Sequence, residues 1–275
     1  MHRIYLPASP LLNNRISITA EKAHYLRSVL RCRKGDSLTI FDGTGKCFKT
    51  TIVKADRREI ITEVIEKFSC NLESHLNITL VQSLLKGEKM DMVVQKTTEL
   101  GVKEIVPVIT ERSQLRETKK LVRWRKIAEE ASRQSGRSVV PVIHEVAEFK
   151  NIFSTQAYEN YTPLSTFTKG GSKGGGFIFY EEEGMRLSDA VKIIKQSYNP
   201  PAPLFSKPPL PPFSKGGQGG LYISIGPEGG FTKQEVAFAK DKGLLITSLG
   251  RRILMAETAA IAAVTLVQFL LGDLS

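Results

Sequence analysis

Residues 76–110, LNITLVQSLLKGEKMDMVVQKTTELGVKEIVPVIT, decide the fold class of this chain. The stretch begins and ends with short apolar runs rich in β-branched residues, which are typical of buried strands. Between these runs, apolar residues recur at helical spacing from Met90 to Leu100, and Gly101 is placed to end the helix. A strand, a helix and a second strand in this order predict one unit of a parallel α/β sheet.

The same alternation continues toward the C-terminus. Residues 121–131 repeat the helical spacing, FIFY (177–180) and YISI (222–225) indicate buried strands, and the chain ends in a helix rich in alanine and leucine. We therefore expect residues 73–275 to form an α/β domain whose largely parallel sheet is covered on both faces. The final helix is apolar nearly all round, so it must be covered by the sheet or by another subunit, and this suggests dimerisation.

Residues 1–72 have a different texture and predict a separate small domain. SLTIFDGTGKCFKTTIV (37–53) contains two β-rich runs around a glycine turn, and REIITEVIEKF (58–68) continues with alternating apolar positions, as in a small antiparallel sheet or barrel. A short helix is expected after Thr19, the candidate N-cap. The GTGK motif at 43–46 lacks the spacing of a phosphate-binding loop and precedes a strand, so it predicts a hairpin turn.

Two low-complexity stretches interrupt the α/β domain, at about 157–176 and 197–220. PLSTFTKGGSKGG (163–175) and PLPPFSKGGQGG (209–220) share a pattern, so they suggest a duplicated insertion. Chain of this composition buries too little apolar surface to offset its ordering entropy, and we expect two mobile surface loops.

The formal net charge of +11 favours an anionic partner, and nucleic acid is the main candidate; generic solubility charge is the alternative. Three cysteines and four histidines are scattered without metal-ligand spacing, so we expect reduced thiols and no metal site. No segment of the sequence resembles a membrane span or a signal peptide, and a cytoplasmic protein is expected.

Two glycine-bearing strand ends are the candidate ligand loops. YISI runs into Gly-Pro-Glu-Gly-Gly (226–230), and a Thr-x-x-Glu capping box at Thr232 and Glu235 opens the next helix. A second strand ends at Gly250 and leads into RRILMAETAA (251–260). Neither loop has dinucleotide or triphosphate spacing, so bare backbone beside an apolar Ile-Leu pair suits an adenine ring better than a pyrophosphate. A tight turn without a ligand is the alternative.

Four motifs of this chain resemble those of one family, and they occur along the chain in the order of that family. ISIGPEGGFTKQE, SLGRRILMAETAAIAA, VQSLLKGEKMDMVVQKTTELGVKEIVPVITERSQ and WRKIAEEASRQSGRSVVPVI are similar to the RsmE family of 16S ribosomal RNA uridine-N3 methyltransferases, in the SPOUT superfamily. The resemblance implies an RNA-binding PUA-like β-barrel domain followed by a SPOUT α/β domain with a trefoil knot. It also implies a homodimer, S-adenosylmethionine as cofactor, and 16S rRNA or the small ribosomal subunit as partner.

The resemblance also implies which positions line the cofactor. They lie on three loops: Tyr180 and Glu181; Ile225, Gly226, Pro227, Glu228, Gly229 and Gly230; and Leu249, Gly250, Ile253, Leu254 and Thr258. The chain departs from the family pattern at Met255, where relatives usually have an arginine. This difference puts one positive charge of the substrate side in doubt.

For the chemistry, uridine N3 must lose its imide proton before or during methyl transfer. We expect Arg252 to stabilise the developing uracil oxyanion and Glu257 to orient Arg252 or to accept the proton through water; an ion pair capping the last helix is the alternative. The expected phosphate contacts are Arg3, Arg27, Arg31, Lys86, Lys89, Arg112, Arg133 and Arg137. The competing functions are a non-catalytic RNA-binding or ribosome-assembly protein and a nucleotide-dependent regulator.

Overall fold

The computed structural model describes residues 2–7, 14–56, 58–70, 72–152, 175–197 and 220–274. The chain divides into two compact units. Unit 1 comprises Met1–Glu73 and Glu129–Val140, and unit 2 comprises Ser74–Ala128 and Pro141–Ser275. The sequence assigned 129–140 to the second domain, whereas the structure groups these residues with the first.

Unit 1 is built on a five-stranded sheet in the order β1-β3-β4-β5-β2. All neighbouring pairs are antiparallel except β1 and β3, which run parallel. The turn at 42–45 joins β3 to β4, as the sequence predicted, and its Gly43 and Gly45 have positive φ of 82° and 103°. The strands are β1 (His2–Tyr5), β2 (Arg15–Thr19), β3 (Ser37–Phe41), β4 (Lys46–Ala55) and β5 (Glu59–Ser69).

The expected short helix is present as α1 (Ala20–His24), which continues into a π-helical turn over Tyr25–Val29. Thr19 occupies its N-cap in an extended conformation, but its side chain makes no capping hydrogen bond. Every second residue of a strand faces the same side of the sheet. On one side, Ile18 of β2, Leu38 of β3 and Ile60 of β5 form an apolar core with Leu26 of the π-helical turn.

Residues 129–140 are tied to unit 1 by buried polar contacts. The Arg137 guanidinium is 3% exposed and lies 2.8 Å from the Glu73 carboxylate, which also accepts hydrogen bonds from the backbone of Ser138 and Val139 at 3.0 Å. Arg3 of β1 donates to the Arg137 carbonyl oxygen at 2.6 Å. Because of these contacts, unit 1 consists of two segments that are far apart in the sequence.

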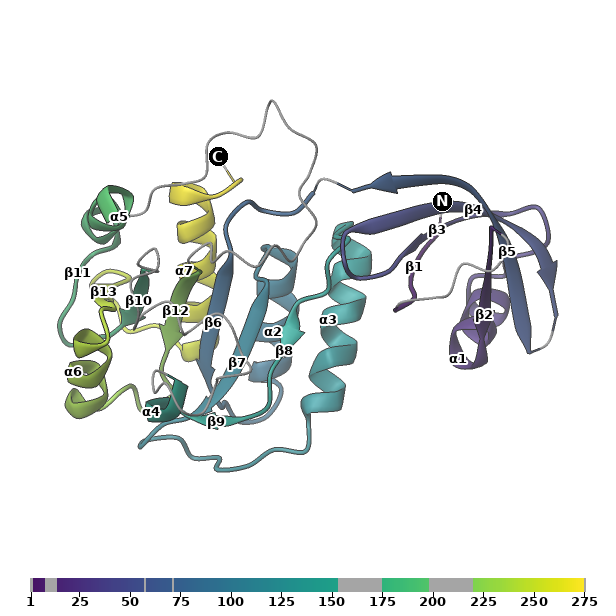
Figure 1. The fold of residues 1–275 in the computed structure, drawn as a ribbon. Coiled ribbons are helices and arrows are strands. Elements are labelled where there is room, and N and C mark those ends of the chain that lie inside the picture. Colours follow the sequence, from purple (N-terminus) through teal and green to yellow (C-terminus); the bar gives the residue numbers. More distant parts are fainter. Residues whose placement is uncertain are drawn as a thin grey trace. The chain divides into compact units, whose positions relative to one another are not determined.

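Unit 2 contains an all-parallel sheet in the order β11-β13-β10-β12-β6-β7-β8, with β9 pairing β7 (Figure 1). The parallel α/β fold predicted from the sequence is thereby confirmed. β10 lies between β12 and β13 although both follow it along the chain. The strands are β6 (Ile78–Ser83), β7 (Glu104–Ile109), β8 (Val142–Ile143), β9 (Ala147–Glu148), β10 (Gly176–Phe179), β11 (Met185–Arg186), β12 (Leu221–Ile225) and β13 (Leu245–Ser248).

Helices cover this sheet, as Figure 1 shows. One face packs Val81, Ile178 and Tyr222 against Phe231 and Val236, at the start of α6. On the other face α7 packs on β12 and on α2. The helices are α2 (Lys89–Glu99), α3 (Leu121–Ser135), α4 (Phe149–Ile152), α5 (Leu187–Ser197), α6 (Lys233–Asp241) and α7 (Ala256–Leu271); the residues of α3 from Glu129 onward belong to unit 1.

The remaining sequence predictions concern the two inserts, the cysteines, membrane spans and metal sites. Most of the two inserts, 157–176 and 197–220, lies outside the described residues, although Gly176 begins β10 and Ser197 ends α5. All three cysteines are free thiols, as predicted. Among the described residues, no helix has the length and apolar character needed to cross a membrane, and no group of three or more potential ligands is placed to hold a metal ion.

Candidate active site

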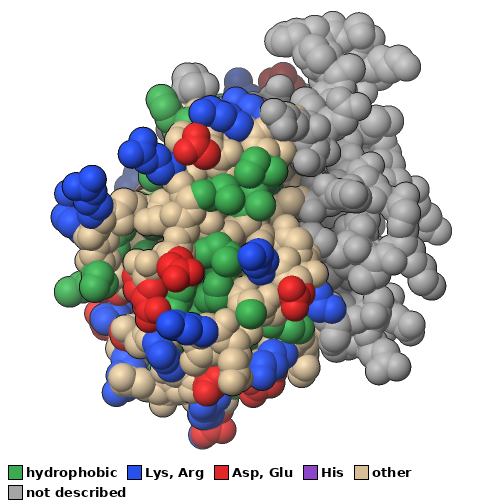
Figure 2. Space-filling view, turned by 90° about the vertical axis from the view of Figure 1, so that its left-hand side faces the viewer, with side chains coloured by type: hydrophobic (Ala, Val, Ile, Leu, Met, Phe, Trp, Pro, Cys, Tyr) green, Lys and Arg blue, Asp and Glu red, His purple; other side chains and the backbone are tan. Residues whose placement is uncertain are grey.

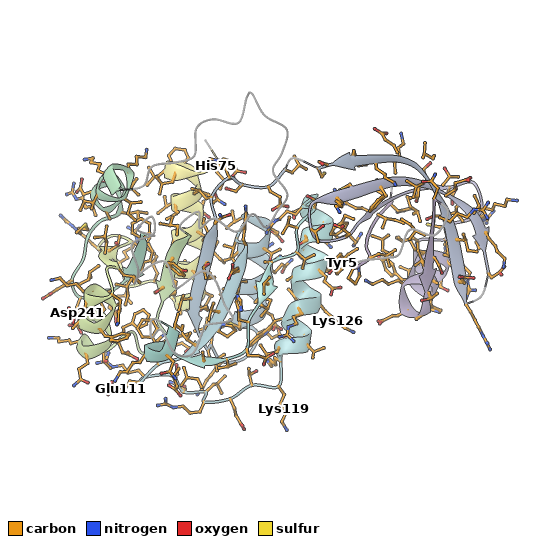
Figure 3. The ribbon with its side chains drawn as sticks, viewed as in Figure 1. Tyr5, His75, Glu111, Lys119, Lys126 and Asp241 are labelled. Carbon is orange, nitrogen blue, oxygen red and sulfur yellow. The ribbon has the colours of Figure 1, made fainter. Side chains whose placement is uncertain are left out.

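A pocket of about 370 Å³ opens where three neighbouring strands of unit 2 end. β12, β10 and β13 are adjacent and parallel, so their carboxyl ends share one edge of the sheet, the place where ligands of such sheets bind. In Figure 3, Glu111 marks this edge just after β7, and His75, just before β6, marks the opposite edge. The volume lies in the range of small-molecule sites.

The pocket wall is mostly main chain and apolar side chains from the three strand ends. It is completed by the first residues of α2 and α7. The lining residues are Lys89, Phe179, Tyr180, Glu181, Ile225, Gly226, Pro227, Glu228, Gly230, Ser248, Leu249, Gly250, Arg252, Ile253, Leu254, Met255, Ala256 and Ala259.

A side chain at either of two glycines of the loop after β12 would crowd the neighbouring atoms. A Cβ at Gly226 would lie 3.2 Å from the Gly230 carbonyl carbon and from the Phe231 nitrogen. Gly230 has a φ of +69°, and a Cβ there would lie 2.0 Å from Glu181 Oε1. The Glu181 carboxylate therefore packs directly on bare backbone, and both residues belong to the pocket wall.

The loop after β12 is stabilised by the capping box at the start of α6 and by Arg112. Thr232 and Glu235 form the predicted capping box at the start of α6, and the Glu235 carboxylate also accepts a 2.8 Å hydrogen bond from the Glu111 backbone. The Arg112 guanidinium donates to the carbonyl oxygens of Gly229 at 2.9 Å and Phe231 at 3.5 Å. These contacts fix the conformation of the loop before any ligand binds.

Charged groups cluster on the side of the pocket where α2 and α7 begin. Lys89 Nζ lies 3.3 Å from Glu228 Oε1 and 3.8 Å from Glu257 Oε2. Burial alone would raise the pKa of Glu228, but hydrogen bonds from its own backbone N–H and that of Lys86, together with the Lys89 ammonium, lower it. Glu228 is therefore a carboxylate at neutral pH.

Tyr180 also lines the pocket. Burial, reinforced by the neighbouring Glu182 and Glu181, raises the pKa of its phenol to about 12. The side chain is therefore a neutral hydrogen-bonding group at physiological pH rather than a base.

The structure brings together nearly all positions that the resemblance assigned to the cofactor; Gly229 and Thr258 alone among them do not line the pocket. Arg252 lines it, whereas Glu257 lies behind Lys89. Sequence reasoning missed Phe179, Ser248, Ala256 and Ala259 and assigned Met255 to the substrate side; all five adjoin the predicted residues along the chain. Extending each predicted loop by one or two residues would have found them.

The predicted phosphate contacts separate into three groups. Lys89 and Arg112 belong to the pocket and its loop. Arg3, Arg133 and Arg137 are bound within unit 1, where Arg133 pairs with Glu130. Arg137 is buried, so in this conformation it cannot reach a phosphate, and its motif position is explained by Glu73 instead. Arg27, Arg31 and Lys86 remain as candidates with accessible side chains.

Comparison with known proteins identifies the family. A model described as the RNA methyltransferase domain matches residues 72–268, and one described as the RNA methyltransferase PUA domain matches residues 18–65. The ribosomal RNA small subunit methyltransferase E of Buchnera aphidicola is 30% identical over 99% of this chain and 98% of its own length. The chain belongs to this RNA methyltransferase family. The resemblance that the sequence motifs suggested is thereby confirmed.

Further relatives of this methyltransferase support the same membership. The Bacillus subtilis protein of the same description is 29% identical over 92% of this chain and 89% of its own. A crystal structure of ribosomal RNA small subunit methyltransferase E from Neisseria gonorrhoeae, bound to S-adenosyl methionine, matches with a TM-score of 0.78 and 30% identity over both whole chains. A PUA domain followed by an α/β methyltransferase domain is therefore the architecture of this enzyme.

Proposed function

We propose that this methyltransferase transfers a methyl group from S-adenosylmethionine to N3 of a uridine in the 16S rRNA of the small ribosomal subunit. The observation that carries the proposal is the pocket formed by the ends of β10, β12 and β13. It coincides with the loops that the family motifs assign to the cofactor, and the similar N. gonorrhoeae protein is bound to that cofactor.

The residues of the pocket fit this cofactor. Gly226, Gly230 and Gly250 provide backbone that a flat polar group can approach closely, and a Cβ at Gly250 would meet no atom of the described residues within 4 Å. Ile253 and Leu254 supply apolar contact for an adenine ring, and Glu181 and Glu228 supply acceptors for hydroxyl or ammonium donors. When bound, the cofactor provides a methyl group on a positively charged sulfur.

The chain's own residues must align the acceptor base and remove its N3 proton. Alignment of two reactants accounts for a large part of such rate enhancements. Arg252, exposed on the pocket wall, is the candidate for stabilising charge that develops on the uracil. Glu257 is the candidate proton acceptor through water, because its buried Oε2 accepts no hydrogen bond from the described residues and lies 3.8 Å from the Lys89 ammonium. Watson–Crick pairing hides N3, so the target uridine must be unpaired or flipped out.

We further propose that unit 1 binds RNA through phosphate contacts from Arg27 and Arg31, and that Lys86 of unit 2 adds a further phosphate contact. The PUA match over residues 18–65 and the net charge of +11 support this assignment. A trefoil knot in unit 2 is supported by the placement of β10 between β12 and β13. Because ribosomal RNA is the proposed substrate, the enzyme would act in the bacterial cytoplasm.

A homodimer is the proposed assembly. Large apolar side chains of unit 2 are exposed, among them Ile253 at 85%, Met255 at 68% and Phe269 of α7 at 55%. Figure 2 shows the side of unit 2 that carries α5 and α6, where apolar side chains gather between charged ones. Exposed apolar surface of this kind is typical of protein interfaces, and a second copy that covers Ile253 and Met255, which line the pocket, would also cover part of the pocket.

Two measurements test the proposed function. Calorimetry with S-adenosylmethionine should show stoichiometric binding, and a variant of Gly226 that carries a side chain should weaken it. Mass spectrometry of 16S rRNA from cells with and without the gene should show N3-methyluridine only when the gene is present. Persistence of the modified base after deletion would refute the assignment.

A further inference from the structure

Lys89 occupies a position in the pocket that neither the RNA nor the cofactor assignment explains. It is the first residue of α2, its side chain is 37% exposed, and its ammonium is part of the pocket wall. Two carboxylates from separate parts of the chain hold it: Glu228 in the loop after β12 and Glu257 in the first turn of α7. The ammonium is therefore fixed at the pocket by three different elements.

This placement does not serve the stability of the helix. An α-helix carries partial positive charge at its N-terminus, so a cation there costs roughly 0.3–1 kcal/mol instead of stabilising it. Partly exposed ion pairs such as Lys89–Glu228 contribute roughly 1 kcal/mol at most. A residue that conflicts with its local structure while being held in a pocket is a sign of function.

The surrounding charges indicate what the ammonium can bind. Glu228 and Glu257 leave the three-residue cluster with one excess negative charge, and this disfavours a full anion such as an RNA phosphate or a carboxylate. Lysine has three N–H donors, and the 3.3 Å hydrogen bond to Glu228 uses one of them. The Lys89 ammonium can donate to a carbonyl oxygen, and the Glu228 and Glu257 carboxylates beside it can accept from an N–H. A neutral ring that presents a carbonyl oxygen next to an N–H matches this arrangement. The imide edge of uracil is such a group.

The other charged or titratable groups of the pocket do not duplicate Lys89. Tyr180 is a neutral phenol, and Glu181, packed on Gly230, is an acceptor. Arg252 carries a positive charge but is an exposed residue of the loop after β13. Among the described pocket residues, Lys89 is the cation that two carboxylates orient.

From this geometry we infer that Lys89 is a catalytic residue that donates a hydrogen bond to a carbonyl oxygen of the acceptor uracil, while Glu228 and Glu257 position its ammonium. The inference rests on the proposed function. When the N3–H bond breaks, its electron pair stays on the base, and the proton passes through water to the Glu257 carboxylate. Because Glu257 takes up this proton, the cluster of Lys89, Glu228 and Glu257 loses its excess negative charge as the base gains one, and Lys89 can stabilise the charge that the uracil shares with its carbonyl oxygen.

The test compares two variants. Lys89→Met removes the positive charge and keeps a side chain of similar length, whereas Lys89→Arg keeps the positive charge. Lys96→Met is the matched control, because Lys96 is on the same helix and is paired with Glu99 at 3.0 Å outside the pocket. Three quantities are measured for each full-length variant: the calorimetric Kd for S-adenosylmethionine, the Kd for 16S rRNA as a function of salt, and kcat on unmethylated small subunits as a function of pH.

We expect Lys89→Met to lower kcat roughly a hundredfold near neutral pH, as for the loss of one donor to a developing oxyanion. The deficit should shrink as pH rises from about 7 to about 9, because hydroxide then supplies the imide anion without help from the lysine. Lys89→Arg should retain more activity than Lys89→Met, and Lys96→Met should match the wild type. The cofactor Kd and the RNA Kd should change less than about threefold.

Each alternative role of Lys89 gives a different result. A cofactor Kd raised more than about tenfold with kcat preserved would overturn the inference in favour of a cofactor contact. A weaker RNA Kd with a salt slope reduced by about one would overturn it in favour of a phosphate contact. Unchanged kcat at every pH would overturn it outright. If instead the wild-type enzyme fails to methylate small-subunit RNA, the proposed function itself is wrong, which the control measurements reveal independently of Lys89.

Discussion

The substitution Gly230→Ala separates two effects that a side chain would have on the cofactor loop. Gly230 has a φ of +69°, and a Cβ would lie 2.0 Å from Glu181 Oε1, far inside contact distance. Gly87 is the matched control, because its φ is +65° and a Cβ there would meet no atom within 4 Å. Both changes impose the left-handed conformation on alanine, but Gly230→Ala alone also displaces the Glu181 carboxylate.

The magnitudes follow from these two terms. Alanine in the left-handed region costs about 1 kcal/mol of unfolding free energy, and we expect this loss in both variants. A hydrogen bond to a charged carboxylate contributes roughly 1.5–3 kcal/mol, so displacing Glu181 should weaken S-adenosylmethionine binding by a factor of about ten or more. Gly87→Ala should leave the affinity unchanged.

Urea denaturation measures the stability of both variants, and calorimetry measures their cofactor affinity. Glu181→Ala in the wild-type background should reproduce the affinity loss of Gly230→Ala without its stability loss. Equal cofactor affinity in the Gly230 and Gly87 variants would refute the reasoning, because the contact with Glu181 would then have no part in binding.

Three further predictions concern the support of the same pocket. Arg112→Ala should weaken cofactor binding severalfold, because Nη1 of the guanidinium then no longer holds the carbonyl oxygens of Gly229 and Phe231 in place; calorimetry of the variant checks this, and an unchanged affinity would count against it. Thr232→Ala should lower the unfolding free energy by about 1 kcal/mol through loss of the N-cap of α6, as measured by denaturation, and an unchanged midpoint would contradict it. Tyr180 keeps its proton in the folded state up to about pH 12, whereas it titrates near 10 when unfolded, so its contribution to stability is complete below pH 10 and is lost as pH rises from 10 to 12. Tyr180→Phe should therefore flatten the alkaline loss of stability measured by thermal unfolding, and an identical alkaline profile would argue against burial of the phenol.

Local signals in the sequence were enough to predict much of the fold. The spacing from Met90 to Leu100 predicted α2, and the structure buries Met90, Val93 and Val94 on that face. The Thr232–Glu235 capping box and the hairpin at 42–45 were also found where the sequence placed them. These features depend on residues near one another in the chain, so a single sequence contains the information for them.

Contacts between distant residues were the part that the sequence could not supply. Arg137 was interpreted as a phosphate contact, whereas its partner Glu73 is 64 residues away. Lys89 was assigned in the same way, and its partner Glu228 is 139 residues away. A charged side chain has the same pattern in a sequence whether it faces solvent or a carboxylate, because the pairing is decided only by tertiary structure.

The participation of residues 129–140 in unit 1 has a consequence for protein synthesis. A nascent chain that has emerged only as far as Glu73 lacks the Arg137 guanidinium that pairs with that carboxylate, and Arg3 lacks its acceptor on the Arg137 backbone. The N-terminal unit can therefore be completed only after about half of the protein, up to Val140, has left the exit tunnel. Until then its first strands lack the segment that completes the unit.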